Sequence, residues 1–91
     1  MKIVFAPQYK AQLLSIIAFI AKDKKTAATD FKNELQFKIS QLKTYPKIYR
    51  QSIYSNDENI RDLIFKGYTI VYEIKKNQID ILDIFKWIDK E

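Results

Sequence analysis

Hydrophobic residues recur every three or four positions through two long stretches in the first half of the chain. In the first stretch, from Gln8 to about Lys22, they fall at Tyr9, Leu13, Ile16, Ile17 and Ile20. The second begins with Thr26 as a helix cap, stops before Pro46, and carries them at Phe31, Leu35, Ile39 and Leu42. This spacing puts the apolar side chains on one helical face, and a helix ends before a proline. We therefore expect two amphipathic helices folded as an antiparallel hairpin.

The second half of the chain alternates between apolar and polar positions, as strands do. Strands are expected at residues 60–65, 68–74 and 79 to about 87, with a hairpin loop at 75–78. Gly67, the only glycine, falls where the chain must reverse between the first two. In the last strand, strict alternation places Ile79, Ile81, Phe85 and Trp87 on one side. A short apolar run at residues 3–5 predicts one further strand before the helices.

The element order is therefore strand, helix, helix and three strands. Helices packed on one face of an antiparallel three-stranded meander, with the N-terminal strand nearby, make an α+β fold. A length of 91 residues fits a single domain that spans residues 1–91. The sequence contains no repeat or linker that would divide it.

The amino-acid composition excludes several kinds of catalytic and metal-binding site. The chain has no Cys and no His, so thiolate chemistry, the usual zinc sites and a neutral-pH imidazole base are excluded. We expect neither a metal nor a cofactor. The net charge of +5 suits an acidic partner or nucleic acid. The longest apolar run, residues 13–21, is too short to span a bilayer, and no signal peptide is visible. A cytoplasmic protein without a membrane partner is expected.

Four segments carry a family likeness: Ala6-Pro7 followed by Ala11–Ile16 and Phe19–Ala21 of the first helix; Leu42–Pro46 as "L-x-x-aromatic-P"; Ile60–Leu63 with Gly67–Ile74; and Ile79–Lys86 as the closing strand. In this order they resemble the RelE/ParE superfamily of bacterial toxins. The resemblance implies the toxin of a type II toxin–antitoxin system, held inactive in a hetero-oligomer with its cognate antitoxin. It also implies that the antitoxin covers grooves and open strand edges of the toxin.

The branches of this superfamily differ in mechanism. RelE-like members cleave mRNA on the ribosome, and ParE-like members bind DNA gyrase. Cleavage requires cations and proton-transfer groups around the scissile phosphate. Here Thr69 stands where cleaving members place an Arg, Asp62 follows Arg61, and the end of the chain carries acidic residues. These departures favour the ParE-like branch and a gyrase inhibitor that is not an enzyme. An mRNA endonuclease acting on the ribosome, or a non-toxic partner-binding relative, stays an alternative.

Four residues are the candidates for partner binding: Arg61, Lys66, Lys86 and Trp87. If the protein were a ribonuclease, Arg61, Lys66 and Lys86 would be its candidate catalytic set. Three of them have a structural interpretation as well. Arg61 could form an ion pair with Glu73 or Asp83 across the sheet, and Lys66 could be a solvated turn residue. Trp87 could close the core or anchor an interface.

Overall fold

The computed structural model describes residues 1–86 as one α+β domain, which confirms the predicted fold class. Its elements are β1 (Lys2–Phe5), α1 (Pro7–Asp23), α2 (Lys25–Ser40), the 3-10 turn η1 (Gln41–Lys43), β2 (Arg50–Gln51), β3 (Ile60–Phe65), β4 (Tyr68–Ile74) and β5 (Gln78–Lys86). Trp87 lies outside the described residues.

The strands form one mixed sheet in the order β1-β5-β4-β3-β2. Strands β3, β4 and β5 make the expected antiparallel meander, whereas β1 runs parallel to β5. Parallel pairing requires a long crossover connection, which the two helices supply. The short strand β2 pairs antiparallel with β3. The sequence did not predict β2, because two residues are too few to show alternation.

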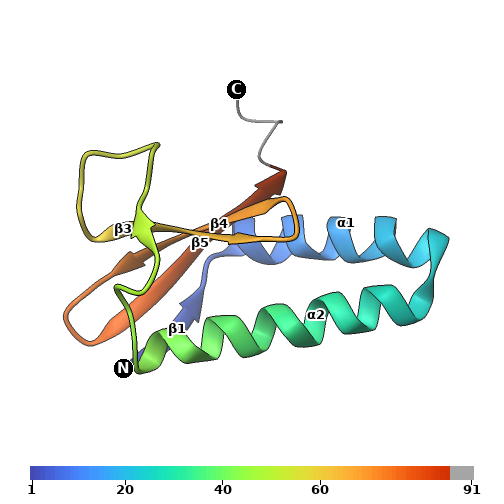
Figure 1. The fold of residues 1–91 in the computed structure, drawn as a ribbon, viewed down its shortest axis with the longest axis horizontal. Coiled ribbons are helices and arrows are strands. Elements are labelled where there is room, and N and C mark those ends of the chain that lie inside the picture. The colour runs from blue at the N-terminus through green and yellow to red at the C-terminus, as the bar shows by residue number, and fades with distance from the viewer. Residues whose placement is uncertain (87–91) are drawn as a thin grey trace.

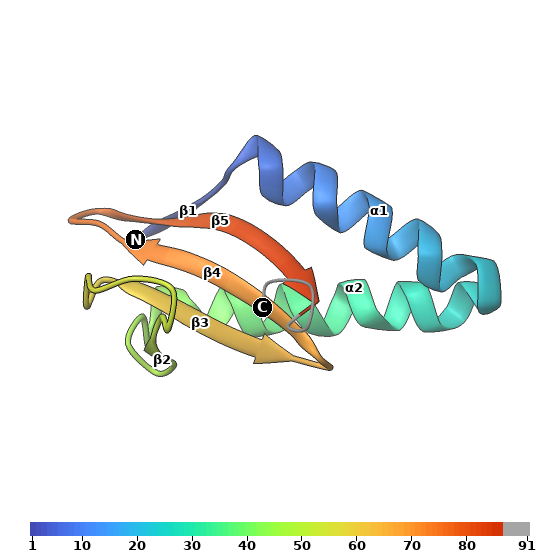
Figure 2. The ribbon, with the colours of Figure 1, turned by 90° about the horizontal axis from the view of Figure 1, so that it is seen from above.

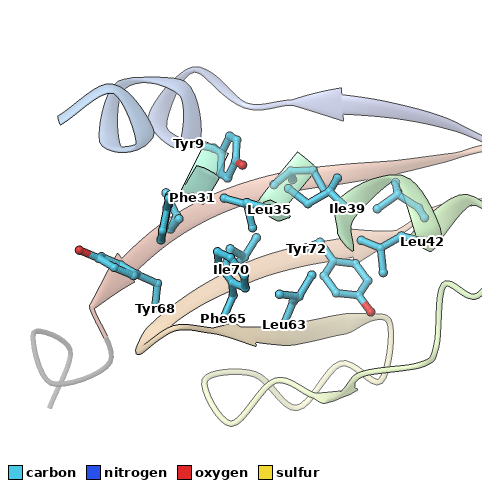
Figure 3. Close-up of a cluster of buried hydrophobic side chains, with 13 residues drawn as sticks. Tyr9, Phe31, Leu35, Ile39, Leu42, Leu63, Phe65, Tyr68, Ile70 and Tyr72 are labelled. Carbon is cyan, nitrogen blue, oxygen red and sulfur yellow. The ribbon is translucent and has the colours of Figure 1, made fainter. Parts of the chain in front are cut away.

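The two helices lie on one side of the sheet, and α2 crosses beneath it (Figures 1 and 2). The predicted stripe on α2 forms the helical half of the core, since Phe31, Leu35 and Ile39 are all buried. Leu63, Ile70 and Tyr72 face it from the sheet (Figure 3). Burying such side chains contributes about 1.5–3 kcal/mol each.

The helical hairpin turns more tightly than the sequence suggested. Only Lys24 separates the helices, and its extended backbone (φ −155°, ψ 114°) serves as the cap of both. Thr26 therefore lies inside the first turn of α2, and its predicted role as the helix cap is wrong. The hairpin projects beyond the end of the sheet at which β5 ends (Figure 2).

A β-bulge changes which residues of β5 face the core. The pairing with β4 shifts register between Val71 and Tyr72, where Val71 pairs with Asp83 and Tyr72 with Ile81. The extra residue reverses the alternation. Ile84 is consequently fully buried, whereas Phe85 points to the other face and contacts Tyr54 with ring centroids 5.5 Å apart. The predicted placement of Phe85 beside Ile79 and Ile81 is wrong for this reason.

The reversal between β3 and β4 uses two residues with positive φ. Lys66 has φ 50° and Gly67 φ 84°, the backbone signature of a two-residue type I′ hairpin. Gly67 was expected at this reversal. Lys66 adopts a conformation that is costly for a residue with a side chain. The geometry of this tight turn therefore sets the direction in which the Lys66 side chain leaves the backbone.

Candidate functional site

The structure separates the candidate residues between the two ends of the sheet. Tyr68 pairs with Lys86 on one side and with Phe65 on the other. Lys86 therefore lies at the same end as the Lys66 turn. Arg61 pairs with Tyr72 near the opposite end. Lys66 and Lys86 can share a partner, but Arg61 lies too far along β3 to complete a catalytic set with them.

Arg61 is engaged by the protein itself. Its Nε donates to the Glu58 carbonyl oxygen at 2.8 Å, and its Nη1 donates to the Tyr49 carbonyl oxygen at 3.0 Å. The predicted ion pair with Glu73 or Asp83 is wrong, because the guanidinium turns to these backbone acceptors. It thereby ties both ends of the segment between η1 and β3 to the sheet.

Tyr72 reinforces the same connection. Its hydroxyl donates to the Pro46 carbonyl oxygen at 2.7 Å. Burial raises the pKa of Tyr72 to about 12, and the nearby Arg61 charge opposes that rise. A neutral, buried phenol is a structural donor and does not serve as a base-stacking platform.

Two other positions on β3 and β4, Asp62 and Thr69, are also internal. The Asp62 side chain is buried, and its Oδ2 accepts the Ile53 backbone N–H at 3.2 Å and lies 3.7 Å from Arg50 Nη2. Thr69, where the resemblance places an Arg in cleaving members, is fully buried. Neither side chain is placed to contact an RNA phosphate.

Lys66 is exposed and reaches back to the helices. Its Nζ lies 3.3 Å from Glu34 Oε2 and 5.5 Å from the Phe65 ring centroid. Below this turn, Phe31 packs against Phe65 and Tyr68, with ring centroids 5.1 and 5.4 Å apart. This aromatic support holds the turn firmly, while the ion pair itself is exposed and weak.

A groove of about 410 Å³ opens between α1 and the end of β5, and we refer to it as the terminal groove. Polar, aliphatic and aromatic side chains line it: Gln12, Ser15, Ile16, Phe19, Tyr68, Ile84, Phe85 and Lys86. Lys86 Nζ lies 5.7 Å from the Phe19 ring centroid. The Tyr68 hydroxyl points away from the other labelled core side chains (Figure 3). The terminal groove thus offers a cation, a hydroxyl and an aromatic ring together.

Phe19 is the functional candidate that the sequence analysis missed. Its side chain is 63% exposed, although phenylalanine side chains are usually buried in folded proteins. A signal was present, because Phe19 falls outside the apolar stripe of its helix. An aromatic residue off the stripe of an amphipathic helix is a candidate contact residue.

Other kinds of site find little support in the described part of the chain. Within residues 1–86, no group of three or more acidic side chains could hold a metal ion. No helix among these residues is long and apolar enough to cross a membrane.

These features define a small α+β domain in which a helical hairpin packs on a five-stranded mixed sheet. The family model described as "ParE toxin of type II toxin-antitoxin system, parDE" matches residues 3–86. The chain belongs to this ParE toxin family. A solved structure of the chromosomal ParDE TA system from P. aeruginosa has the same fold, with a TM-score of 0.74 and 16% identity over 94% of this chain and 95% of that chain. No curated protein sequence matches.

Proposed function

We propose that this ParE-family toxin inhibits DNA gyrase by binding and does not cleave nucleic acid itself. The supporting observation is the state of the β3 and β4 positions that resemble the RNA-cleavage site of RelE-like members. Arg61 is bound to two backbone carbonyls, and Asp62 and Thr69 are buried. Transition-state stabilisation needs charge aimed at the reacting phosphate, and these side chains are aimed into the protein.

The terminal groove is the surface through which we propose that the protein contacts its target. Phe19 supplies exposed aromatic area, and Lys86 supplies a cation that lies 5.7 Å from the centroid of that ring. Aromatic and cationic side chains of this kind dominate binding energy at protein interfaces. Tyr68 lines the groove and packs against Phe31 with ring centroids 5.4 Å apart, and a side chain held by such packing loses less entropy on binding.

Two assays on the purified protein test this proposal. DNA supercoiling by gyrase should stop, with cleaved-DNA complexes accumulating, while mRNA in translating ribosomes should stay intact. The reverse result, cleaved mRNA with normal gyrase activity, would support the RelE-like alternative and return attention to Lys66 and Lys86. Activity in neither assay would favour a non-toxic partner-binding relative.

Neutralisation by a cognate antitoxin in a hetero-oligomer is the second part of the proposal. The protein carries a net charge of +5 and an open groove, which suits an acidic, groove-filling partner. Co-expression of the candidate antitoxin should restore growth and yield a stable complex. Growth arrest that persists despite a stable complex would contradict neutralisation.

A further inference from the structure

The stretch of chain from the second half of α2 to the loop before β3 is basic throughout. Residues 35–56 contain no Asp or Glu, although the whole chain has 11. The cations in this range are Lys38, Lys43, Lys47 and Arg50. Arg50 is already engaged, because its Nη2 lies 3.7 Å from the Asp62 carboxylate. Within residues 1–86, the exposed Lys43 and Lys47 form no ion pair, so their ammonium groups are available to an anionic partner.

An aromatic side chain is exposed between these two lysines. Tyr45 lies midway between Lys43 and Lys47 in the sequence and is 61% exposed. In the described part of the chain, no other aromatic ring packs against it. We refer to residues 43–48 as the Pro46 turn. The turn presents a cation, an aromatic ring and a second cation in succession.

The backbone of the Pro46 turn is held in place, although most of its side chains lie in solvent. The Tyr45 N–H donates to the Gln41 carbonyl oxygen at 3.0 Å, and the Ile48 N–H donates to the Tyr45 carbonyl oxygen at 3.2 Å. From the sheet, the Tyr72 hydroxyl donates to the Pro46 carbonyl oxygen at 2.7 Å. The proline ring also fixes its own φ. A surface preorganised in this way loses less backbone entropy when a ligand binds.

We propose that the Pro46 turn binds single-stranded nucleic acid without sequence preference, with phosphates at Lys43 and Lys47 and a base stacked on Tyr45. Phosphates and bases alternate along a single strand, and every base has a face that stacks on an aromatic ring. A duplex keeps its bases stacked on one another, so it offers the turn only its phosphates. DNA and RNA share this chemistry, and the experiment distinguishes them.

Other occupants match the Pro46 turn less well. A second copy of the chain would bring Lys43 and Lys47 close to like charges. An anionic membrane would attract the lysines, but stable attachment needs a larger apolar face than Tyr45 and Ile48 supply.

The inference goes beyond the proposed function, because the binding needs no gyrase and occurs away from the terminal groove. The Pro46 turn contributes no residue to the lining of that groove. It follows the C-terminal end of α2, at the opposite end of this helix from the tip of the helical hairpin (Figure 1).

Fluorescence anisotropy with the full chain tests the stacking. The probes are labelled oligo(dT) and oligo(U) of about ten nucleotides and a DNA duplex of the same length. We expect a single strand to bind more tightly than the duplex, and the tighter of the two single strands identifies the natural source. Tyr45→Leu should weaken this binding at least about fivefold, whereas Tyr45→Phe, which keeps the ring, should bind normally.

Urea unfolding confirms that each variant is folded before its binding is compared. Equal losses in Tyr45→Leu and Tyr45→Phe, or tighter binding of the duplex than of either single strand, would overturn the proposal.

The phosphate contacts are tested by salt. Lys43→Ala and Lys47→Ala should each reduce the slope of log K against log salt concentration by about 0.7. Lys25→Ala is the matched control, since Lys25 is exposed at the start of α2, and it should leave the slope unchanged. An equal reduction in Lys25→Ala would show diffuse attraction to the net charge and would overturn the proposal. Tighter binding to phosphatidylserine vesicles than to either strand, or self-association through the Pro46 turn, would also overturn it.

Discussion

Arg61 and Lys86 are both cations on interior strands of one sheet, but they lie near opposite ends and meet different surroundings. Arg61 donates to two backbone carbonyls and connects the segment between η1 and β3 to the sheet. Lys86 lies exposed at the mouth of the terminal groove and contacts one aromatic ring. The comparison shows that a basic residue in a strand does not by itself indicate a site. What its donors already contact decides whether it can bind something else.

The largest difference between the two ends should appear on removing Arg61. Arg61→Ala leaves the Tyr49 and Glu58 carbonyls without their charged donor, and each such bond contributes about 1–2 kcal/mol net. We expect the free energy of unfolding to fall by about 2–3 kcal/mol in urea titrations. A loss below about 0.5 kcal/mol, the scale of an ordinary surface substitution, would show that Arg61 does not have the structural role assigned to it.

Tyr72 should show a smaller effect at the same end. Tyr72→Phe deletes the donor to the Pro46 carbonyl and should cost about 1 kcal/mol. It should also change the response to alkali. In the unfolded chain the phenols of Tyr9 and Tyr72 ionise near 10.0, but in the folded protein burial raises both pKa values to about 12. The folded state therefore retains protons that the unfolded state loses, so stability falls as pH rises through this window.

The companion variant for this pH response is Tyr9→Phe, which removes the second phenol but keeps the ring beside Phe5. Each single variant should lose part of the alkaline destabilisation, and the double variant should lose more. Urea unfolding at a series of pH values, together with the ultraviolet absorbance of tyrosinate, measures both quantities. An unchanged pH dependence in the double variant would show that other groups cause it.

The turn at the terminal-groove end offers the next test. At φ 84°, Gly67→Ala should cost about 1 kcal/mol through backbone strain alone, since an added Cβ would meet no atom within 4 Å. Lys66→Gly should be close to neutral, because relief of strain at φ 50° offsets the greater freedom of glycine in the unfolded chain. A large loss in Lys66→Gly would mean that the Lys66 ion pair with Glu34 contributes more than an exposed pair should.

Lys86→Ala should have the smallest effect on stability, about 0.5 kcal/mol or less. Within residues 1–86, the contact that it breaks is an exposed cation–π contact with Phe19. A nearly unchanged free energy of unfolding in Lys86→Ala, together with the large loss in Arg61→Ala, would sharpen the contrast between the two ends. A loss matching that of Arg61→Ala would erase the contrast.

The apolar spacing of the sequence was sufficient to place the helices and the three long strands. The stripe from Phe31 on α2 to Leu42 in η1 is buried throughout, because one helical face packs against one sheet. The strict alternation of β5 failed at its bulge, where one extra residue turned Ile84 inward and Phe85 outward. A bulge depends on pairing with a neighbouring strand, which periodicity within one strand does not reveal.

The candidate site was only partly predictable. Lys86 was selected from the sequence and does line the terminal groove. The partners of Arg61 could not be foreseen, since Tyr49 lies 12 residues away and contributes only its backbone carbonyl. Phe19 was overlooked because the prediction followed the buried stripe of α1 and gave less attention to the apolar residue outside it.

The central claim is that the terminal groove, and not the Arg61 end, contacts the target. The most direct test is gyrase inhibition by the double variant Phe19→Ala/Lys86→Ala beside Phe37→Ala. Phe37 is the matched control, since it is 65% exposed on α2 and does not line the terminal groove. We predict that the double variant, folded as judged by urea unfolding, inhibits about tenfold or more weakly, while Phe37→Ala inhibits normally. Full inhibition by the double variant would contradict the claim.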